Sequence, residues 1–224
     1  MSVISNARRA ADPRVRRTQA AVVEAARALF LSRGYAGTTV DDIAARAGLT
    51  KRTFYNNYSD KAALFRQIIA DVTGLADAFV SDLRQEFTGI SCDNLETALH
   101  ELGQRLALGI VRPEVIAIRR LLIGESREFP RLARQYFDRA PGQVLEALAS
   151  GFRRLHRNRV LDVADSRRAA AQFAYLVAGE LLDRAVLTGS IPERKHIVSG
   201  ARAGVETFLA RYRIARDGRH VARI

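Results

Sequence analysis

Residues 50–57 bring hydroxyl, ammonium, guanidinium and amide groups together in the order Thr-Lys-Arg-Thr-Phe-Tyr-Asn-Asn. Such groups donate hydrogen bonds to phosphate oxygens, and arginine and asparagine also pair with base edges in the major groove of DNA. On a short helix, several of these side chains would project outward. The stretch therefore predicts contacts with nucleic acid, made by Thr50, Lys51, Arg52, Thr53, Asn56 and Asn57.

Two short helices are needed to position these side chains, and the sequence carries signals for both. Thr39 begins the first helix, with Asp42 three residues later as a variant of the capping box. Gly48 permits a sharp turn, because glycine adopts a positive φ at little cost. Thr50 caps the second helix, which we expect to run through Asn57. The pattern is typical of a helix-turn-helix, whose second helix enters the major groove.

The rest of the chain shows helical spacing of apolar residues and no convincing alternating strand pattern. We expect helices over about residues 15–33, 60–87, 95–106 and 113–126, then one from Pro130 that is broken near residues 140–142. Two more are expected over about residues 166–187 and 192–214. The prediction is an all-α fold, in which an N-terminal three-helix helix-turn-helix domain is joined by one long helix to a second helical domain.

The charge balance favours an anionic partner, because the 224 residues carry a formal net charge of +12. Lysine occurs only at Lys51, Lys61 and Lys195, so arginine supplies most of this charge. High-GC codon usage is the main alternative cause of this bias, so the arginine excess alone proves little. Arginines also gather in residues 1–17 and 211–224. The first group predicts a mobile arm that follows the DNA backbone or enters the minor groove, with a solvated tail as the alternative. We interpret the second group as a solvated tail.

Other classes of function lack support in the sequence. Cys92 is the only cysteine, which excludes an internal disulfide and fits a reducing cytoplasm. We find no signal peptide and no apolar run of about 18 residues, so we expect a cytoplasmic protein without membrane contact. His100, His156, His196 and His220 lack metal-ligand spacing, and no GxSxG, P-loop or GxGxxG motif occurs. We therefore expect no enzyme, no cofactor and no metal site.

Over about residues 15–65 the chain carries a dense set of matching positions: Arg33-Gly34-Tyr35, Thr38-Thr39, Ile43-Ala44, Ala47-Gly48, Thr50-Lys51, Thr53, Phe54-Tyr55, Tyr58, Lys61 and Leu64-Phe65. This set resembles the signature of the TetR/AcrR family of transcriptional regulators. The stretch from Ile118 to Leu148, with Leu121-Leu122-Ile123-Gly124-Glu125 and Phe129-Pro130, resembles the AefR-type subgroup less strongly.

The resemblance implies DNA-binding roles for Thr39, Thr50, Lys51, Arg52, Thr53, Tyr55, Asn56, Asn57 and Lys61. Thr39 and Lys61 would bind phosphates. Arg52 is bulkier than the small residue often found at its position, which favours a direct base contact. Asn57 replaces a common histidine and Tyr58 a common phenylalanine, so we expect the contact at Asn57 to differ from the family pattern.

The resemblance also implies four regions: residues 1–13 as a basic arm, 14–62 as the DNA-binding domain, 63–214 as the effector-binding and dimerisation domain, and 215–224 as a basic tail. Candidate effector contacts are Phe79, Leu102, Leu106, Ile118, Arg119, Leu122, Phe137, Phe152, Phe173 and Tyr175, although the apolar ones equally fit an ordinary core. Arg119 is unexpected on an apolar stripe. It would bind an anionic effector or form a salt bridge with Glu114 or Glu125.

Small residues on the last two helices favour close helix approach, and in the TetR family these helices pair across a two-fold axis. Candidate dimer contacts are Leu176, Gly179, Gly200, Gly204, Val205 and Phe208. The resulting hypothesis is a homodimeric repressor that binds a double-stranded palindromic operator and is released by a small, mainly hydrophobic effector. The alternatives are an activator, a regulator that answers to a partner protein, and a basic DNA-binding protein without an effector.

Overall fold

The computed structural model describes residues 13–214, without the side chain of Leu75. Within that range every regular element is a helix, and an isolated bridge pairs Leu161 with Arg213. The all-α fold predicted from the sequence is therefore confirmed. The basic arm, except its last residue Pro13, and the predicted tail at residues 215–224 lie outside the described residues.

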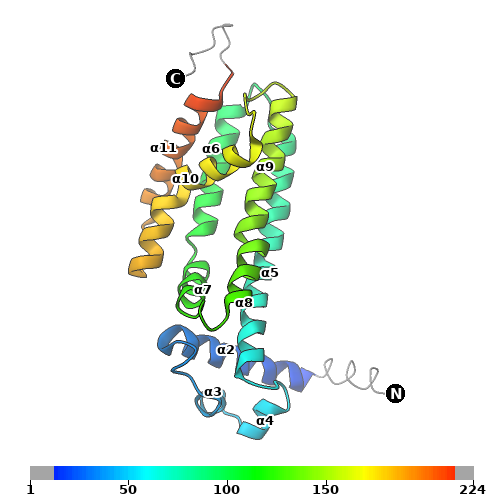
Figure 1. Cartoon of the computed structure of the whole chain (residues 1–224), viewed down its shortest axis with the longest axis vertical. Helices are drawn as coiled ribbons and strands as arrows, with labels where there is room; N and C mark the ends of the chain where they lie inside the picture. The colour runs from blue at the N-terminus through cyan, green and yellow to red at the C-terminus, as the bar shows by residue number, and fades with distance from the viewer. Residues whose placement is uncertain (1–12, 215–224) are drawn as a thin grey trace, which may run out of the picture. The chain divides into compact units, whose positions relative to one another are not determined.

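The helices are α2 (Pro13–Arg33), α3 (Val40–Arg46), α4 (Lys51–Tyr55), α5 (Lys61–Glu86), η1 (Phe87–Gly89), α6 (Leu95–Ile110), α7 (Pro113–Gly124), α8 (Pro130–Arg139), α9 (Pro141–Arg157), α10 (Ser166–Thr188) and α11 (Arg194–Tyr212) (Figure 1). Local signals account for several ends. Gly34 follows α2 with a φ of +75°, and Pro141 begins α9, which confirms the predicted break. Asp60 caps α5, because its Oδ1 accepts a hydrogen bond from the Ala63 amide at 2.6 Å.

Two compact units divide the described chain. Unit 1 contains residues 13–72 and 120–134, and unit 2 contains residues 73–119 and 135–214. Helices α5, α7 and α8 each contribute residues to both units. The sequence pattern placed a domain boundary between residues 62 and 63, and the bounds of the functional domains stay a prediction.

Unit 1 is built around apolar side chains of four helices that are almost fully buried: Val22, Ala26, Leu29 and Phe30 of α2, Ile43 of α3, Phe54 of α4, and Leu64, Phe65, Ile68 and Ile69 of α5. An aromatic cluster adjoins this core. The Tyr35 ring lies 5.6 Å from Phe30, 5.0 Å from Phe65 and 4.7 Å from Phe129, measured between ring centroids. Short helices such as α3 and α4 are marginal alone, so this shared core must hold them in place.

Unit 2 has a larger core to which α6, α9, α10 and α11 contribute most of the side chains. Helices α10 and α11 lie side by side (Figure 1), and their backbones approach closely at Gly204. A Cβ atom at Gly204 would lie 2.3 Å from the carbonyl oxygen of Leu176 on α10. The glycine is therefore required by packing inside the protomer.

Candidate nucleic-acid interface

Helix α3 begins with the predicted capping box. The Asp42 amide donates to the Thr39 hydroxyl at 3.1 Å, and the Thr39 amide donates to the Asp42 carboxylate at 2.9 Å. The Thr39 hydroxyl also donates to that carboxylate at 2.6 Å. These side-chain and backbone hydrogen bonds lower the pKa of Asp42. Because both donors of Thr39 point at Asp42, a bond from Thr39 to a phosphate requires that the carboxylate be displaced.

The turn between α3 and α4 follows the predicted geometry. Gly48 has a φ of +68°, which favours glycine at this position. The Leu49 amide donates to the carbonyl of Ala44 at 2.9 Å, and the Gly48 amide donates to the carbonyl of Ala45 at 3.2 Å. The turn thus satisfies the last carbonyls of α3 while it reverses the chain into α4.

Helix α4 is fixed by its cap and by one buried ring. The Thr50 hydroxyl accepts from the Thr53 amide at 3.2 Å, so Thr50 is the predicted N-cap. Phe54 is fully buried, and its ring lies 5.4 Å from that of Tyr55 and 5.7 Å from that of Tyr58. Burial of Phe54 sets the rotation of α4 and leaves the opposite face to solvent.

The solvent face of α4 carries Lys51, Arg52, Tyr55 and Asn56, all of which are exposed. The Lys51 ammonium donates to the Asp41 carboxylate at 3.1 Å, and this hydrogen bond raises the pKa of Lys51. Within residues 13–214 the Arg52 side chain has neither a hydrogen bond nor an ion pair. Arg52 is therefore the cation of this face that is available to a ligand without a competing carboxylate.

Two of the predicted DNA contacts have local roles in this structure. The Asn57 amide group donates to the Thr53 carbonyl at 2.8 Å and so closes the end of α4. The Lys61 ammonium donates to the carbonyls of Tyr35 at 2.8 Å and Thr38 at 2.7 Å, and it lies 4.1 Å from the centroid of the Tyr35 ring. Lys61 therefore holds the connection between α2 and α3, with one of its three N–H groups left for another acceptor.

The structure places Glu125 and Phe129 in unit 1, in contacts that the sequence pattern does not predict; Glu125 was expected only as a salt-bridge partner of Arg119. Glu125 accepts a hydrogen bond from the Tyr35 amide at 3.0 Å. Phe129 packs on Tyr35 and lies 5.0 Å from the Phe65 ring centroid. Both residues belong to the stretch that resembles the AefR-type subgroup, but their contacts join distant parts of the sequence, and the Tyr35–Glu125 bond spans 90 positions. No local pattern signals them.

The candidate effector contacts do not share one environment. Leu102, Leu106, Ile118, Phe152 and Phe173 are almost fully buried within unit 2, and the last two rings are 5.4 Å apart, as in an ordinary core. Leu122 is buried, and Phe79 and Arg119 are half-buried.

Two of these candidates need correction. Phe137 is 54% exposed and Tyr175 is 68% exposed, so neither lines an enclosed site within the protomer. Each occupies a solvent-facing position of its helix, α8 and α10 respectively, and helical apolar spacing alone does not reveal this.

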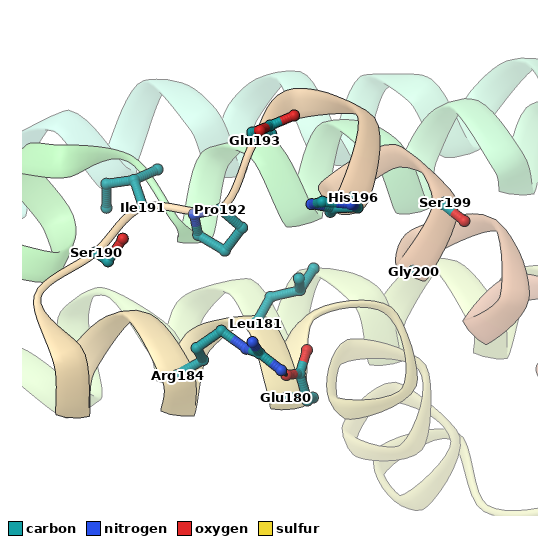
Figure 2. Close-up of a pocket in the computed structure, with 10 residues that line it drawn as sticks. All are labelled: Glu180, Leu181, Arg184, Ser190, Ile191, Pro192, Glu193, His196, Ser199 and Gly200. Atoms are coloured by element: carbon teal, nitrogen blue, oxygen red, sulfur yellow. The ribbon is translucent and has the colours of Figure 1, made fainter.

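A hollow of about 550 Å³ lies between the end of α10 and the start of α11 (Figure 2). Leu181, Ile191 and Pro192 line it with apolar side chains, and the Glu180–Arg184 pair of α10 and His196 add polar ones. None of the predicted effector contacts lines it, and Gly200 is the one predicted dimer contact that does.

Three predicted dimer contacts face the interior of their own protomer. Val205 and Phe208 are fully buried in the core of their own protomer, and Gly204 packs against the α10 backbone. By contrast, Leu176 is 42% exposed, and Gly179 and Gly200 are half-buried. Only these last three can reach a second protomer.

The capped helix pair, the Gly48 turn and the exposed basic face of α4 define a helix-turn-helix regulator that binds DNA. Residues 22–68 match the family model of bacterial regulatory proteins of the tetR family, and residues 97–214 match that of the C-terminal domain of AefR-like transcriptional repressors. The chain therefore belongs to the TetR family of transcriptional regulators, which are not enzymes.

Individual relatives agree with this assignment. The chain is 28% identical over 211 residues to ArpR of Pseudomonas putida, a probable HTH-type transcriptional regulator, and the match covers 88% of this chain and 92% of ArpR. It is 38% identical over 64 residues to the HTH-type transcriptional repressor DhaR of Mycobacterium sp. strain GP1, which is 29% of each chain.

Solved structures show the same fold. The flavonoid-responsive regulator FrrA has a TM-score of 0.63 at 29% identity, over 88% of this chain and 97% of FrrA. SmeT, the repressor of the Stenotrophomonas maltophilia multidrug efflux pump SmeDEF, has a TM-score of 0.63 at 21% identity in its complex with triclosan. That match covers 90% of this chain and 93% of SmeT. No helix within residues 13–214 is long and apolar enough to cross a membrane.

Proposed function

We propose that this protein is a dimeric repressor in which α4 of each protomer enters the major groove of one half of a palindromic operator. One observation carries the proposal: burial of Phe54 turns Arg52 and Tyr55 to solvent on the same short helix. Arg52 reads a base edge, and Lys51, Thr53, Tyr55, Asn56 and Asn57 contact the DNA backbone. Chromosomal DNA as the target gives the protein a cytoplasmic location.

The protomers associate through the solvent faces of α10 and α11. Tyr175 and Leu176 are large apolar side chains that are exposed on α10, and the neighbouring Gly179 allows close approach. Two recognition helices related by symmetry match two half-sites about one helical turn apart, near 34–36 Å, or otherwise bridge successive grooves. Leu176→Asp is therefore expected to lower the dimer mass in sedimentation equilibrium, whereas Leu31→Asp, on a 40% exposed residue of α2, serves as the matched control.

A small, mainly hydrophobic molecule releases the protein from its operator. The support is by likeness: SmeT is known in complex with triclosan, and FrrA is described as flavonoid-responsive. A ligand shifts the equilibrium only by its preference for the form that does not bind DNA. The alternatives, an activator or a basic protein without an effector, differ in observable ways. An activator raises transcription from its site, and a protein without an effector gives no ligand-dependent change in operator affinity.

Nuclease footprinting on the DNA that flanks the gene tests the proposal. We expect protection of one palindromic site, and Arg52→Ala should weaken specific binding by roughly 1–3 kcal/mol and relax preference at one base pair in each half-site. Arg46→Ala, on an exposed arginine of α3, is the matched control and should retain that preference. Uniform protection without a preferred site, or an unchanged footprint with Arg52→Ala, would contradict the assignment.

A further inference from the structure

Arg119 of α7 is a half-buried cation with an unsatisfied donor. Its Nε atom is inaccessible to solvent and has no hydrogen-bond partner among the residues that the structure describes. The neighbouring positions Ile116 and Ile118 are buried and apolar. Buried polar groups are almost always hydrogen-bonded, and a guanidinium stays protonated in proteins, so it cannot relieve the cost by losing its proton.

The two carboxylates that the sequence offered as salt-bridge partners lie beside other groups. Glu114 lies 3.6 Å from the Arg112 guanidinium, measured from Oε2 to Nε, and this Oε2 has no hydrogen-bond partner among the described residues. Glu125 accepts the hydrogen bond of the Tyr35 amide. Neither forms an ion pair with Arg119 within residues 13–214. A purely structural salt bridge therefore does not account for this arginine.

Tyr136 of α8 supplies a second polar group beside Arg119. Its side chain is 9% exposed, and burial raises the pKa of its hydroxyl, an effect that the charge of Arg119 and a hydrogen bond with Arg119 partly offset. The phenol is therefore neutral at pH 7 and keeps its O–H donor. A guanidinium and a phenol hydroxyl thus lie together in apolar surroundings.

We propose that Arg119 and Tyr136 bind the carboxylate of a hydrophobic effector, a proposal that rests on the proposed function of unit 2 in effector binding. The planar guanidinium offers Nε–H and a terminal N–H as a fork that matches the two oxygens of a carboxylate. The Tyr136 hydroxyl donates to one of the same oxygens. The carboxylate of an aromatic or aliphatic acid accepts a hydrogen bond from the unsatisfied Nε–H, and the apolar part of the acid is compatible with the neighbouring Ile116 and Ile118.

The test uses benzoate, 2-naphthoate and octanoate, each compared with its primary alcohol, in calorimetric titrations of the full chain without DNA. We expect at least one acid to bind more tightly than its alcohol. Arg119→Met should weaken binding of that acid about 10- to 100-fold and leave the alcohol within about twofold. Tyr136→Phe should give a smaller loss of the same kind. Arg112→Met, which removes an exposed arginine paired with Glu114, is the matched control and should bind both as wild type does.

Three outcomes would overturn the proposal: equal binding of acid and alcohol by wild type, a preference for the acid that survives in Arg119→Met, or no binding of any of the three acids. Thermal unfolding of the ligand-free protein is a second measurement. Arg119→Met removes both the unsatisfied Nε–H and the hydrogen bond with Tyr136, and Tyr136→Phe removes that hydrogen bond alone. An arginine that awaits a ligand should therefore let Arg119→Met unfold no earlier than Tyr136→Phe, and earlier unfolding of Arg119→Met would assign Arg119 a structural role instead. Because these titrations contain no DNA, failure of operator binding would count against the proposed function alone.

Discussion

Replacement of Lys61 by methionine separates the two roles that the lysine can have. In this structure its ammonium donates to the carbonyls of Tyr35 and Thr38 and lies against the Tyr35 ring. Hydrogen bonds that involve a charged group contribute about 1.5–3 kcal/mol each, and a cation–π contact about 0.5–1 kcal/mol. Because the ammonium is half-buried, part of this sum is lost to solvent screening. We expect Lys61→Met to lower the free energy of unfolding by about 2–4 kcal/mol.

Urea unfolding followed by circular dichroism measures this loss, and the salt dependence of operator binding measures the other role. Each phosphate contact contributes about 0.9 to the slope of log K against log salt concentration. Lys61→Met should leave this slope unchanged where the variant is folded. The control is Lys51→Met, which removes an exposed ammonium from α4. It should keep the urea midpoint of wild type and reduce the slope by about 0.9.

The opposite pattern would refute the reasoning. If Lys61→Met unfolds at the urea concentration of wild type and its salt slope falls by about 0.9, then Lys61 binds a phosphate. The contacts with the two carbonyls would then contribute nothing measurable to stability.

Three further changes probe other contacts of the protomer. Glu125→Ala leaves the half-buried Tyr35 amide without its acceptor and should lower the free energy of unfolding by about 1–3 kcal/mol in urea, whereas Glu125→Gln should lose less. Gly204→Ala should lower the thermal midpoint, at a cost of about 1–3 kcal/mol, because its Cβ meets the α10 backbone. Since hydrogen bonds from Thr39 lower the pKa of Asp42, stability from this cap is present above about pH 4 and is lost at lower pH; Thr39→Val should abolish that dependence in urea unfolding across a pH series.

Each of these predictions has an outcome that contradicts it. A wild-type urea midpoint for Glu125→Ala would mean that water replaces the carboxylate at the Tyr35 amide. Gly74→Ala is the control for Gly204→Ala: it places a Cβ in open space within α5 and should gain up to about 1 kcal/mol. If both variants unfold alike, the close approach of α10 and α11 is not what requires glycine. If the stability of wild type and of Thr39→Val depends on pH in the same way, the Thr39–Asp42 cap does not cause the loss of stability in acid.

Features that depend on neighbours in sequence were predictable. The caps at Thr39 and Thr50, and the positive φ of Gly34 and Gly48, each follow from a residue and the few positions around it. The burial of Phe54 also follows from spacing, because one apolar side chain on a short polar helix must face the core. These local features are enough to place the recognition helix and its exposed face.

Features that depend on distant residues were not predictable in the same way. Lys61 is a surface cation by type, and its partners lie 23 and 26 positions earlier as backbone carbonyls, which have no sequence signature. The Arg119 partner was sought among carboxylates nearby in sequence, but Glu114 lies beside Arg112 and Glu125 accepts the hydrogen bond of the Tyr35 amide. In both cases the residue type predicts a positive charge, but it does not predict which acceptor atom the charged group contacts.

The dimer contacts predicted on α10 and α11 differ from the surface of the protomer for another reason. Apolar spacing on a helix indicates that one face is buried, and small residues indicate that another backbone packs closely against it. Neither pattern shows whether the packing partner belongs to the same protomer or to a second one. On α11 the packing partner belongs to the same protomer: Val205 and Phe208 face its core, and Gly204 contacts the backbone of α10. The apolar surface left for a second protomer is then on α10, at Tyr175 and Leu176. Since Gly204 sustains the packing that presents this surface, a bulky residue there would weaken a dimer only indirectly, by disturbing the protomer first.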